Sequence, residues 1–496
     1  MKSLRVPRHL TACALLLALL AAACDNGATP AATPVPAAAT ATTPATVLVP
    51  TVAPETPVPA GAVPAAGPAG VPSATPGPTD PIAPAWARDA VLYQIFVRAF
   101  TPEGTLAAAQ ARLSDLNDLG VNLIYLMPIH PIGLKNRKGS LGSPYSVQDY
   151  STIDPALGTE ADLKAFVTAA HQLGMHVIMD FVANHTAWDN VLTVQHPDWY
   201  AHGAGGVFVP PKADWSDVIQ LDFTKPALRQ YLIDVTTHYV IADGVDGFRC
   251  DYSSGVPLDF WQQWRAALKQ ANPNVFLLSE NSDPPLGTVF DATYDPLTYS
   301  AMTGALMSHR PQWLINDPLI VWKQNGPYRL ETRFLENHDH DRIAQAFSNS
   351  PPAALQTASV YLLTTDGIPF IEAGEEVGIT HTLSLFEPDK IQWAAGNTAL
   401  RDVFKQVLGL RHVNPALSHG DIADGKSSVP GVVAYVRRTP EQQVLVLLCF
   451  AIATQHVAVD PAIAGRTGKD LVSGESVDLS KGLDMAPWSW RIIELH

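Results

Sequence analysis

The chain has 496 residues, of which 47 are acidic and 32 basic, and its formal net charge is -15 at pH 7. This length allows one large domain and a smaller one, and an apolar content of 47% is ample for a sizeable core. The acidic balance argues against nucleic acid and anionic membrane surfaces as partners, because both carry negative charge.

The N-terminus has the pattern of an export signal. Basic residues precede a short apolar stretch and a run of small residues, and the stretch is too short to span a membrane. The run LAAAC at 20–24 resembles a bacterial lipoprotein box, although Ala21 stands where leucine is usual. We therefore expect residues 1–24 to be a lipoprotein signal peptide whose Cys24 is lipidated. The protein would then be exported and anchored to the outer face of the cell membrane, with simple secretion as the alternative.

Residues 25–84 consist almost entirely of Ala, Pro, Thr, Val and Gly, with few charges and no large aromatic side chain. Such a segment cannot bury a core, so we expect a disordered linker that acts as a spacer. Two of the four cysteines lie in the signal peptide, which leaves Cys250 and Cys449. These two fall in different predicted domains, so we do not expect a disulfide between them. Each is expected to be a small buried apolar residue.

Beyond Trp86, short β-rich runs alternate with helical periodicity, which is typical of βα units around a parallel sheet. Helical periodicity is clearest at 159–173, where one face is apolar and Gly174 provides a stop, and it recurs at 259–271. Eight is the strand number of a TIM (β/α)8 barrel, so we predict an α/β fold with such a barrel over residues 85–414. The eight predicted strands are 93–100, 122–129, 176–182, 246–251, 275–281, 290–295, 330–339 and 369–376.

Two further segments complete the predicted architecture. The connection 186–220 is rich in Gly, Pro, Trp and Asp and is too long for a simple turn, so we predict a small inserted subdomain after the third strand, beside the barrel mouth. From Pro415 onward, apolar and polar residues alternate in several runs. This pattern predicts a C-terminal antiparallel β-sandwich domain over residues 415–496.

Polar side chains end several of the predicted strands, and in a parallel barrel such residues face the mouth where active sites are built. Because side chains alternate along a strand, Arg249 and Asp251 share one face of the fourth strand. Glu280 follows the apolar part of the fifth strand. The third strand ends in Asp180, Asn184 and His185, and the seventh ends in Asn337, His338 and Asp339.

At these positions the motifs DFVANH, GFRCD, LLSEN and FLENHD occur in the order and approximate spacing of four motifs of the alpha-amylase family, glycoside hydrolase family 13. The segments GSPYSVQDY and GIPFIEAGEE also resemble that family, and the resemblance spans residues 86–415. Four motifs in register are far more specific than any one of them. The resemblance implies an enzyme that hydrolyses or transfers alpha-linked glucose units of alpha-glucans or malto-oligosaccharides.

The resemblance implies catalytic roles for three acidic residues. Asp251 would be the nucleophile, Glu280 the general acid and base, and Asp339 the stabiliser of an oxocarbenium-like transition state. Retaining hydrolysis requires an ionised nucleophile and a protonated acid roughly 5 to 5.5 Å apart, so that a covalent glycosyl intermediate forms and water then releases it. We expect Arg249 to keep Asp251 ionised and neighbouring carboxylates to keep Glu280 protonated.

The resemblance also implies two further sets of residues. In the substrate-binding set, two histidines hydrogen-bond the sugar at the cleavage point and a tyrosine stacks on it; the set is Tyr145, His185, Arg249 and His338. The supporting set is Asp180, Asn184 and Asn337, and Asp180 would brace neighbouring polar side chains. Any one of these residues alone would more simply be a helix cap or a satisfied core residue, and it is the motif order that favours a site.

Two departures from the family's pattern bear on calcium and on substrate. Many family members bind calcium through an equivalent of Asn184 and an Asp before the fourth strand, but Gln220 stands in the place of that Asp. Hard cations prefer several anionic oxygens, so we expect no metal or other cofactor, with a weakened calcium site as the open alternative. After Asp251 the chain reads Tyr-Ser-Ser-Gly instead of the Lys-His pair that grips the sugar on the leaving side. Alpha-glucosidase, neopullulanase-like and glucosyl-transfer activities therefore stay open beside starch hydrolysis, as does the choice between alpha-1,4 and alpha-1,6 linkages.

Two other function classes are weighed against this hypothesis. A non-catalytic carbohydrate-binding lipoprotein would tend to lack the acidic residues, which are all present here. An unrelated metal-dependent TIM-barrel enzyme would need a cluster of metal ligands on the strand ends, which we do not expect.

Overall fold

The computed structural model describes residues 83–308, 311, 314–316 and 330–496. The predicted signal peptide, with Cys24, and the predicted linker up to residue 82 lie outside the described residues. Within the part of the chain that is described, no helix is both long and apolar enough to cross a membrane.

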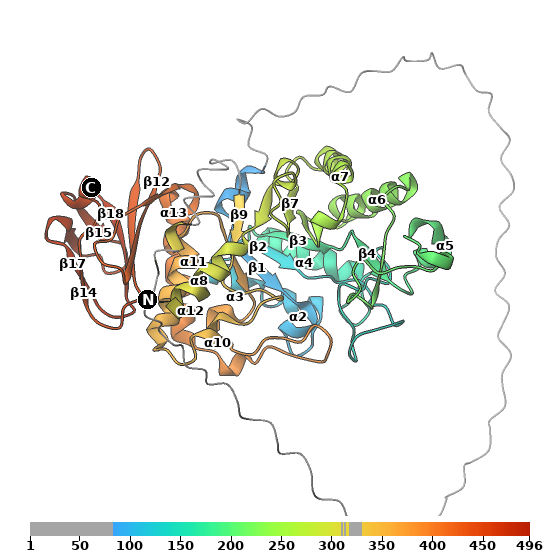
Figure 1. Cartoon of the computed structure of the whole chain (residues 1–496), viewed down its shortest axis with the longest axis horizontal. Helices are drawn as coiled ribbons and strands as arrows, with labels where there is room; N and C mark the ends of the chain where they lie inside the picture. The colour runs from blue at the N-terminus through green and yellow to red at the C-terminus, as the bar shows by residue number, and fades with distance from the viewer. Residues whose placement is uncertain (1–82, 309–310, 312–313, 317–329) are drawn as a thin grey trace, which may run out of the picture. The chain divides into compact units, whose positions relative to one another are not determined.

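Eight parallel strands close into a barrel (Figure 1). Around the barrel the order is β1, β2, β3, β6, β7, β8, β9 and β10, and β10 returns to pair with β1. The predicted TIM barrel is thereby confirmed. The strands span Leu92–Ile95, Leu123–Leu126, His176–Phe181, Gly247–Cys250, Phe276–Ser279, Ala292–Tyr294, Leu330–Arg333 and Ile368–Glu372.

All eight strands end before the predicted boundary, and the difference is largest in three of them. The first stops at Ile95, and Val97–Phe100 forms helix α1 because the chain turns at Phe96, whose carbonyl accepts two amides of that helix. The eighth stops at Glu372 and is followed by a 3-10 turn. The seventh stops at Arg333, so three predicted strand-end residues lie in a loop beyond it: Asn337, His338 and Asp339. The side-chain pattern does not show where hydrogen bonding between strands ends, because the loops beyond the strands also carry polar side chains toward the barrel mouth.

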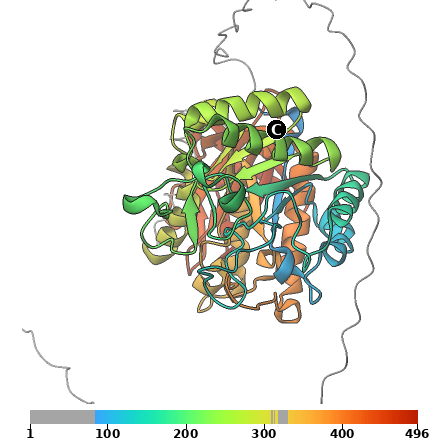
Figure 2. The same ribbon diagram turned by 90° about the vertical axis from the view of Figure 1, so that its right-hand side faces the viewer.

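Helices lie around the outside of the barrel (Figure 2). Helix α4 begins at a capping box between Thr159 and Asp162, and the chain leaves it through Gly174, whose φ is 73°. The longer helices are α3 Leu113–Leu119, α4 Glu160–Gln172, α6 Pro226–Ala242, α7 Leu258–Ala271, α8 Pro296–Ser308, α11 Pro352–Thr364 and α12 Thr398–Val413. The short ones are α2 Leu106–Gln110, α5 Leu192–Gln195, α10 Ile343–Ala346, α13 Pro415–His419 and α14 Pro461–Ala464.

The barrel has an inner and an outer apolar core, because side chains alternate along each strand. In β2, Leu123 and Tyr125 belong to the inner cluster, whereas Ile124 and Leu126 belong to the cluster shared with the helices. The inner positions near the carboxyl ends of the strands are the ones that carry polar atoms toward the mouth.

The segment after β3 forms a small ribbon at the barrel mouth. Strand β4, His185–Ala187, pairs antiparallel with β5, Val218–Gln220, and the segment between them contains α5 and two short 3-10 turns. His185 therefore lies in this ribbon and not at the end of the third strand, while Asp180 lies within β3.

The C-terminal part is an antiparallel β domain, as predicted. One face of its main sheet packs on the barrel unit, where the Tyr435 hydroxyl lies 2.5 Å from Thr364 Oγ1, and the other face packs on a two-stranded sheet. Cys250 and Cys449 are both buried and free. The main sheet runs β11 Asp421–Asp424, β12 Val432–Arg438, β13 Gln443–Cys449, β18 Trp490–Leu495, β15 Thr467–Asp470 and β16 Ser476–Asp478, and the small one pairs β14 Gln455–Val457 with β17 Leu483–Met485.

Candidate active site

Six of the predicted site residues line one cavity of about 450 Å³ at the carboxyl ends of the barrel strands. Its volume is in the range of small-molecule sites. The six are Tyr145, His185, Asp251, Glu280, His338 and Asp339. The other predicted residues contact members of this set from behind; they are Asp180, Asn184, Arg249 and Asn337.

Parallel pairing of β6 and β7 places the two central carboxyls. Asp251 follows β6 and Glu280 follows β7, and the Glu280 amide donates to the Cys250 carbonyl at 3.2 Å, so the ladder continues one step past both strands. Gly247 permits this pairing, because a Cβ at that position would lie 1.8 Å from the carbonyl oxygen of Phe276. The local sequence therefore sets Asp251 and Glu280 side by side.

A single buried guanidinium joins three carboxyl groups. Arg249 is 0% exposed, and its Nη1 lies 3.1 Å from Asp180 Oδ2 and 3.0 Å from Asp251 Oδ1. Its Nη2 forms an ion pair with Glu280 Oε2 at 3.1 Å. A buried charge is costly unless it is paired, so the guanidinium and the carboxyls depend on one another. Strand alternation predicted the contact with Asp251 but gave no sign of the one with Glu280.

Burial governs the protonation of this group. Burial raises the pKa of Asp180 to about 6, although Arg249 lowers it. Burial also raises the pKa of Asp251 well above its ordinary value, the Glu280 carboxylate adds to the rise, and Arg249 opposes it. Arg249 thus favours the ionised form of Asp251, as expected, but burial and the Glu280 carboxylate act in the opposite direction.

Tyr252 fixes the carboxylate of Glu280. The Tyr252 backbone is left-handed, with φ 39° and ψ 48°, and its amide donates to Glu280 Oε2 at 2.6 Å. This conformation is uncommon for a residue with a side chain, so the surrounding loop must stabilise it. One stabilising contact is the indole of Trp261, which donates to the Ser253 carbonyl at 2.9 Å. The sequence gave no signal for this role of Tyr252, since any residue offers a backbone amide.

Asp339 approaches the cavity from the loop after β9. The loop turns at Asn337, whose Oδ1 accepts the Asp339 amide at 2.9 Å, and Asp339 Oδ2 lies 3.3 Å from His338 Nε2. The side chains of Asp251, Glu280 and Asp339 are 13%, 26% and 50% exposed. Asp339 is thus the carboxyl of the three that is most open to a ligand.

Tyr145 and His338 form one wall of the cavity. Their rings stack with centroids 5.4 Å apart, and the Tyr145 hydroxyl lies 2.6 Å from His338 Nε2. Burial lowers the pKa of His338 to about 4, so the ring is neutral at pH 7. Gln94 Nε2 lies 2.6 Å from His338 Nδ1, and the Tyr125 hydroxyl donates to Asp180. Sequence reasoning missed Gln94 and Tyr125, although polar atoms at inward positions of apolar strands were the available signal.

His185 enters the cavity from the inserted ribbon. Burial lowers the pKa of His185 to about 3, so this ring is also neutral at pH 7. Its ring meets that of Trp215 with centroids 5.3 Å apart and the planes at 66°. Both histidines of the site can therefore exchange hydrogen bonds with an uncharged ligand without adding positive charge to the cavity.

The oxygens that calcium would require near Asn184 already accept hydrogen bonds. The side-chain nitrogen of Gln220 donates to the Asn184 carbonyl at 3.0 Å, to Asn184 Oδ1 at 3.1 Å and to the Leu221 carbonyl at 3.1 Å. An amide N–H group brings donors to a place where a cation needs anionic oxygens. The residues present therefore do not fit the calcium site of the family, and independence from calcium stays a prediction.

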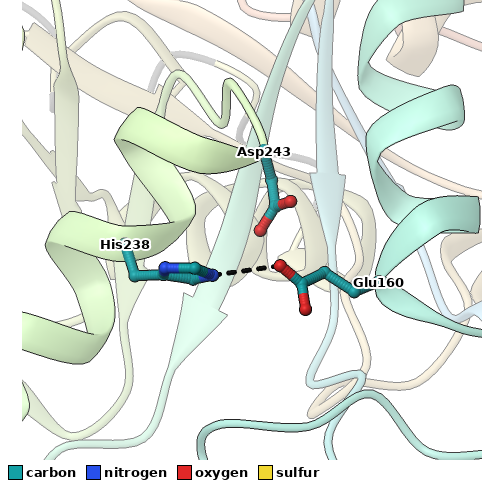
Figure 3. A group of neighbouring side chains, drawn as sticks. All are labelled: Glu160, His238 and Asp243. Carbon is teal, nitrogen blue, oxygen red and sulfur yellow. Dashed lines mark hydrogen bonds and ion pairs between the residues drawn. The ribbon is translucent and has the colours of Figure 1, made fainter.

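One group of side chains away from the cavity has ligand atoms close enough to hold a cation (Figure 3). Glu160, His238 and Asp243 each offer one ligand atom, and these atoms lie within 4.8 Å of one another. Glu160 and His238 already form an ion pair at 3.0 Å, and both side chains are more than half exposed. None of the three residues lines the active-site cavity, so the group has no part in the chemistry considered there.

Comparisons with known proteins agree with this geometry. The sequence pattern of the alpha-amylase catalytic domain matches residues 88–289. The maltogenic alpha-amylase AmyB of Thermotoga neapolitana is 30% identical with a TM-score of 0.76, and an alpha-amylase of Lactobacillus plantarum is 30% identical with a TM-score of 0.74; each match covers 82% of this chain and 99% of the other. Alpha-amylase MalA of Haloarcula japonica is 31% identical over 79% of this chain, which spans 59% of the length of that protein. The chain therefore belongs to the alpha-amylase family of glycoside hydrolases.

Proposed function

We propose that this glycosidase acts on alpha-glucosidic linkages of alpha-glucans or malto-oligosaccharides, with retention of configuration, through a covalent glycosyl-enzyme intermediate. The observation that carries the proposal is the pairing of Asp251 and Glu280 with the one guanidinium of Arg249, at 3.0 and 3.1 Å. Two carboxyls that share a guanidinium favour the short separation of retaining enzymes over the roughly 6.5 to 9.5 Å of inverting ones, which must admit a water.

In this mechanism Asp251 attacks the anomeric carbon while Glu280 protonates the leaving oxygen. Glu280 then takes a proton from the water that releases the sugar from Asp251. Asp339, the most exposed of the three carboxyls, faces the positive charge that develops on the sugar ring. Tyr145, stacked on His338, offers a flat ring to the apolar face of the sugar on the glycone side.

Proton NMR of fresh product, before mutarotation, tests the stereochemistry. Two successive inversions keep the alpha configuration, so the alpha anomer should appear first. A beta anomer at early times would mean a single displacement by water and would exclude Asp251 as a nucleophile.

Substitution separates the two roles. Asp251→Asn should abolish turnover of every substrate, because no covalent intermediate can form. Glu280→Gln should recover its first step with alpha-glucosyl fluoride, whose leaving group needs no proton. An equal response of both variants to the fluoride would contradict this division of labour.

Transfer of the glycosyl unit to a second sugar is the alternative activity, since it uses the same intermediate. The aromatic rings of Trp215 and Tyr252 in the cavity wall favour it, because they offer a surface for an acceptor sugar. Chromatography of products from maltose, maltotriose, starch, pullulan and cyclodextrins separates the possibilities. Products longer than the substrate indicate transfer, and only shorter products indicate hydrolysis.

We further propose that the protein is exported and held at the cell membrane by a lipid on Cys24. The support is the charged start, the short apolar stretch and the small residues before Cys24. Labelling cells with a tagged fatty acid should mark the protein, and Cys24→Ser should remove the label. An unlabelled protein in the culture medium would indicate simple secretion instead.

A further inference from the structure

One wall of the cavity is built from three side chains outside the family motifs: Lys212, Trp215 and Tyr252. The rings of Trp215 and Tyr252 meet edge to face, with centroids 5.0 Å apart and planes at 69°. Lys212 Nζ lies 4.3 Å from the Tyr252 centroid and 4.5 Å from the Trp215 centroid. The inserted subdomain and the loop after β6 thus build one aromatic surface together, which we call the aromatic wall.

The loop after β6 holds the Tyr252 ring in place. Its backbone amide is bonded to Glu280, and the amide of Ser254 donates to Asn281 Oδ1 at 3.0 Å. Gly255 lies against the ring, since a Cβ at that position would come within 2.4 Å of a Tyr252 ring carbon. A surface that is already ordered loses little conformational freedom on binding, which favours the stacking of a sugar.

The aromatic wall adjoins Glu280: its three side chains and Glu280 line the same cavity, and the backbone amide of Tyr252 donates to the Glu280 carboxylate. Under the proposed function Glu280 protonates the departing oxygen, so the departing sugar leaves from this part of the cavity. The glycone side is marked separately by the stacked rings of Tyr145 and His338. The cavity therefore presents one ring surface for each of the two sugars that the bond joins.

We infer that Lys212, Trp215 and Tyr252 form the binding site for an alpha-linked glucose ring on the leaving-group side. The inference rests on the proposed function, because it requires Glu280 to be the acid. The apolar face of the pyranose packs on the aromatic rings. The ammonium of Lys212 is solvent-exposed and held by cation–π contacts, which are weak at exposed positions, so it is free to donate hydrogen bonds to sugar hydroxyls.

The same site accepts a sugar in the transfer direction. The oxygen of an acceptor hydroxyl forms a bond to the anomeric carbon of the glycosyl ester. The ester bond to Asp251 breaks, and its electron pair returns to the Asp251 carboxylate. The hydroxyl proton passes to Glu280, so no reactant beyond the two sugars is required. The aromatic wall should therefore set both the preference for oligosaccharides and the share of transfer.

Two substrates that differ in the leaving group test the inference. The leaving group of maltotriose is a sugar. The leaving group of alpha-maltosyl fluoride is a fluoride ion, which cannot stack on the aromatic wall. Trp215→Ala should lower kcat/KM for maltotriose about tenfold and leave that for the fluoride within about twofold. With the fluoride as donor and maltose as acceptor, the transferred fraction should also fall. Lys212→Met, which keeps the length of the side chain, should show the same selectivity with a smaller loss.

Lys135→Met is the matched control, because Lys135 Nζ lies over the ring of Trp188 at 5.6 Å but does not line the cavity. This control substitution should leave kcat/KM unchanged for both substrates. An equal loss on both substrates in Trp215→Ala would mean that Trp215 only supports the fold, and an unchanged rate on maltotriose would place the leaving sugar elsewhere; either result overturns the inference. A parent enzyme inactive on both substrates would instead overturn the proposed function itself.

Discussion

Replacing Arg249 by methionine should destabilise the protein in a way that depends on pH. Arg249 is buried and neutralises carboxyls at 3.0 to 3.1 Å, and removal of one partner from a buried ionic group costs about 3 to 5 kcal/mol. With Arg249 present, burial already raises the pKa of Asp180 to about 6. Without it the pKa of Asp180 rises further, because the guanidinium is a lowering influence.

The direction of this pH dependence follows from the linkage between protonation and folding. A carboxyl whose folded pKa exceeds its unfolded value favours folding at low pH, and that contribution is lost as pH rises through the folded pKa. In the parent the loss ends near pH 6 for Asp180, whereas in Arg249→Met it continues at about 1.4 kcal/mol per pH unit. The variant should therefore be destabilised more at pH 8 than at pH 6, with an upper limit of about 3 kcal/mol for this difference.

Urea unfolding of parent and variant at both pH values measures this difference. Arg249→Lys is the comparison variant, because it keeps the charge but its single ammonium cannot pair with all three carboxyls as the guanidinium does. It should recover part of the stability at pH 8 while turnover stays low. A free-energy difference between parent and Arg249→Met that is below 1 kcal/mol, or the same at both pH values, would refute the reasoning.

Four other substitutions or treatments have expected outcomes. Gly247→Ala should prevent folding, because its Cβ would lie 1.8 Å from a backbone oxygen, whereas Gly409→Ala in α12, where a Cβ meets nothing within 4 Å, should fold normally; circular dichroism distinguishes them. The unfolded His338 binds a proton near pH 6.5, whereas the buried side chain binds one only near pH 4, so the parent loses stability as the pH falls from 7 to 5. His338→Asn lacks this group, and its loss of stability over the same range should be smaller by about 2 kcal/mol. EDTA should leave activity intact, and calcium-reversible inactivation would contradict the assignment of Gln220.

The sequence predicted those parts of the site that depend on local periodicity. Alternation along one strand set Arg249 beside Asp251, and the contact is present at 3.0 Å. Contacts between distant segments left no such trace: Gln94 meets His338 only because the barrel closes. Likewise, Lys212 meets Tyr252 only because the inserted subdomain folds over the mouth and Tyr252 adopts a left-handed backbone. Periodicity describes one strand at a time, whereas closure of the barrel decides which strand ends meet.

The raised pKa of Asp251 leads to a last prediction. The Glu280 carboxylate is the next cause of that rise after burial, so Glu280→Gln should lower the pKa of Asp251. Alpha-glucosyl fluoride needs an ionised nucleophile and no acid, so its rate of glycosyl-enzyme formation should follow ionisation of Asp251 alone. The single-turnover rate should increase with pH in both proteins. This increase should occur at a lower pH in Glu280→Gln than in the parent. If both rates rose at the same pH, the Glu280 carboxylate would not contribute to the raised pKa of Asp251, and the reasoning would be wrong.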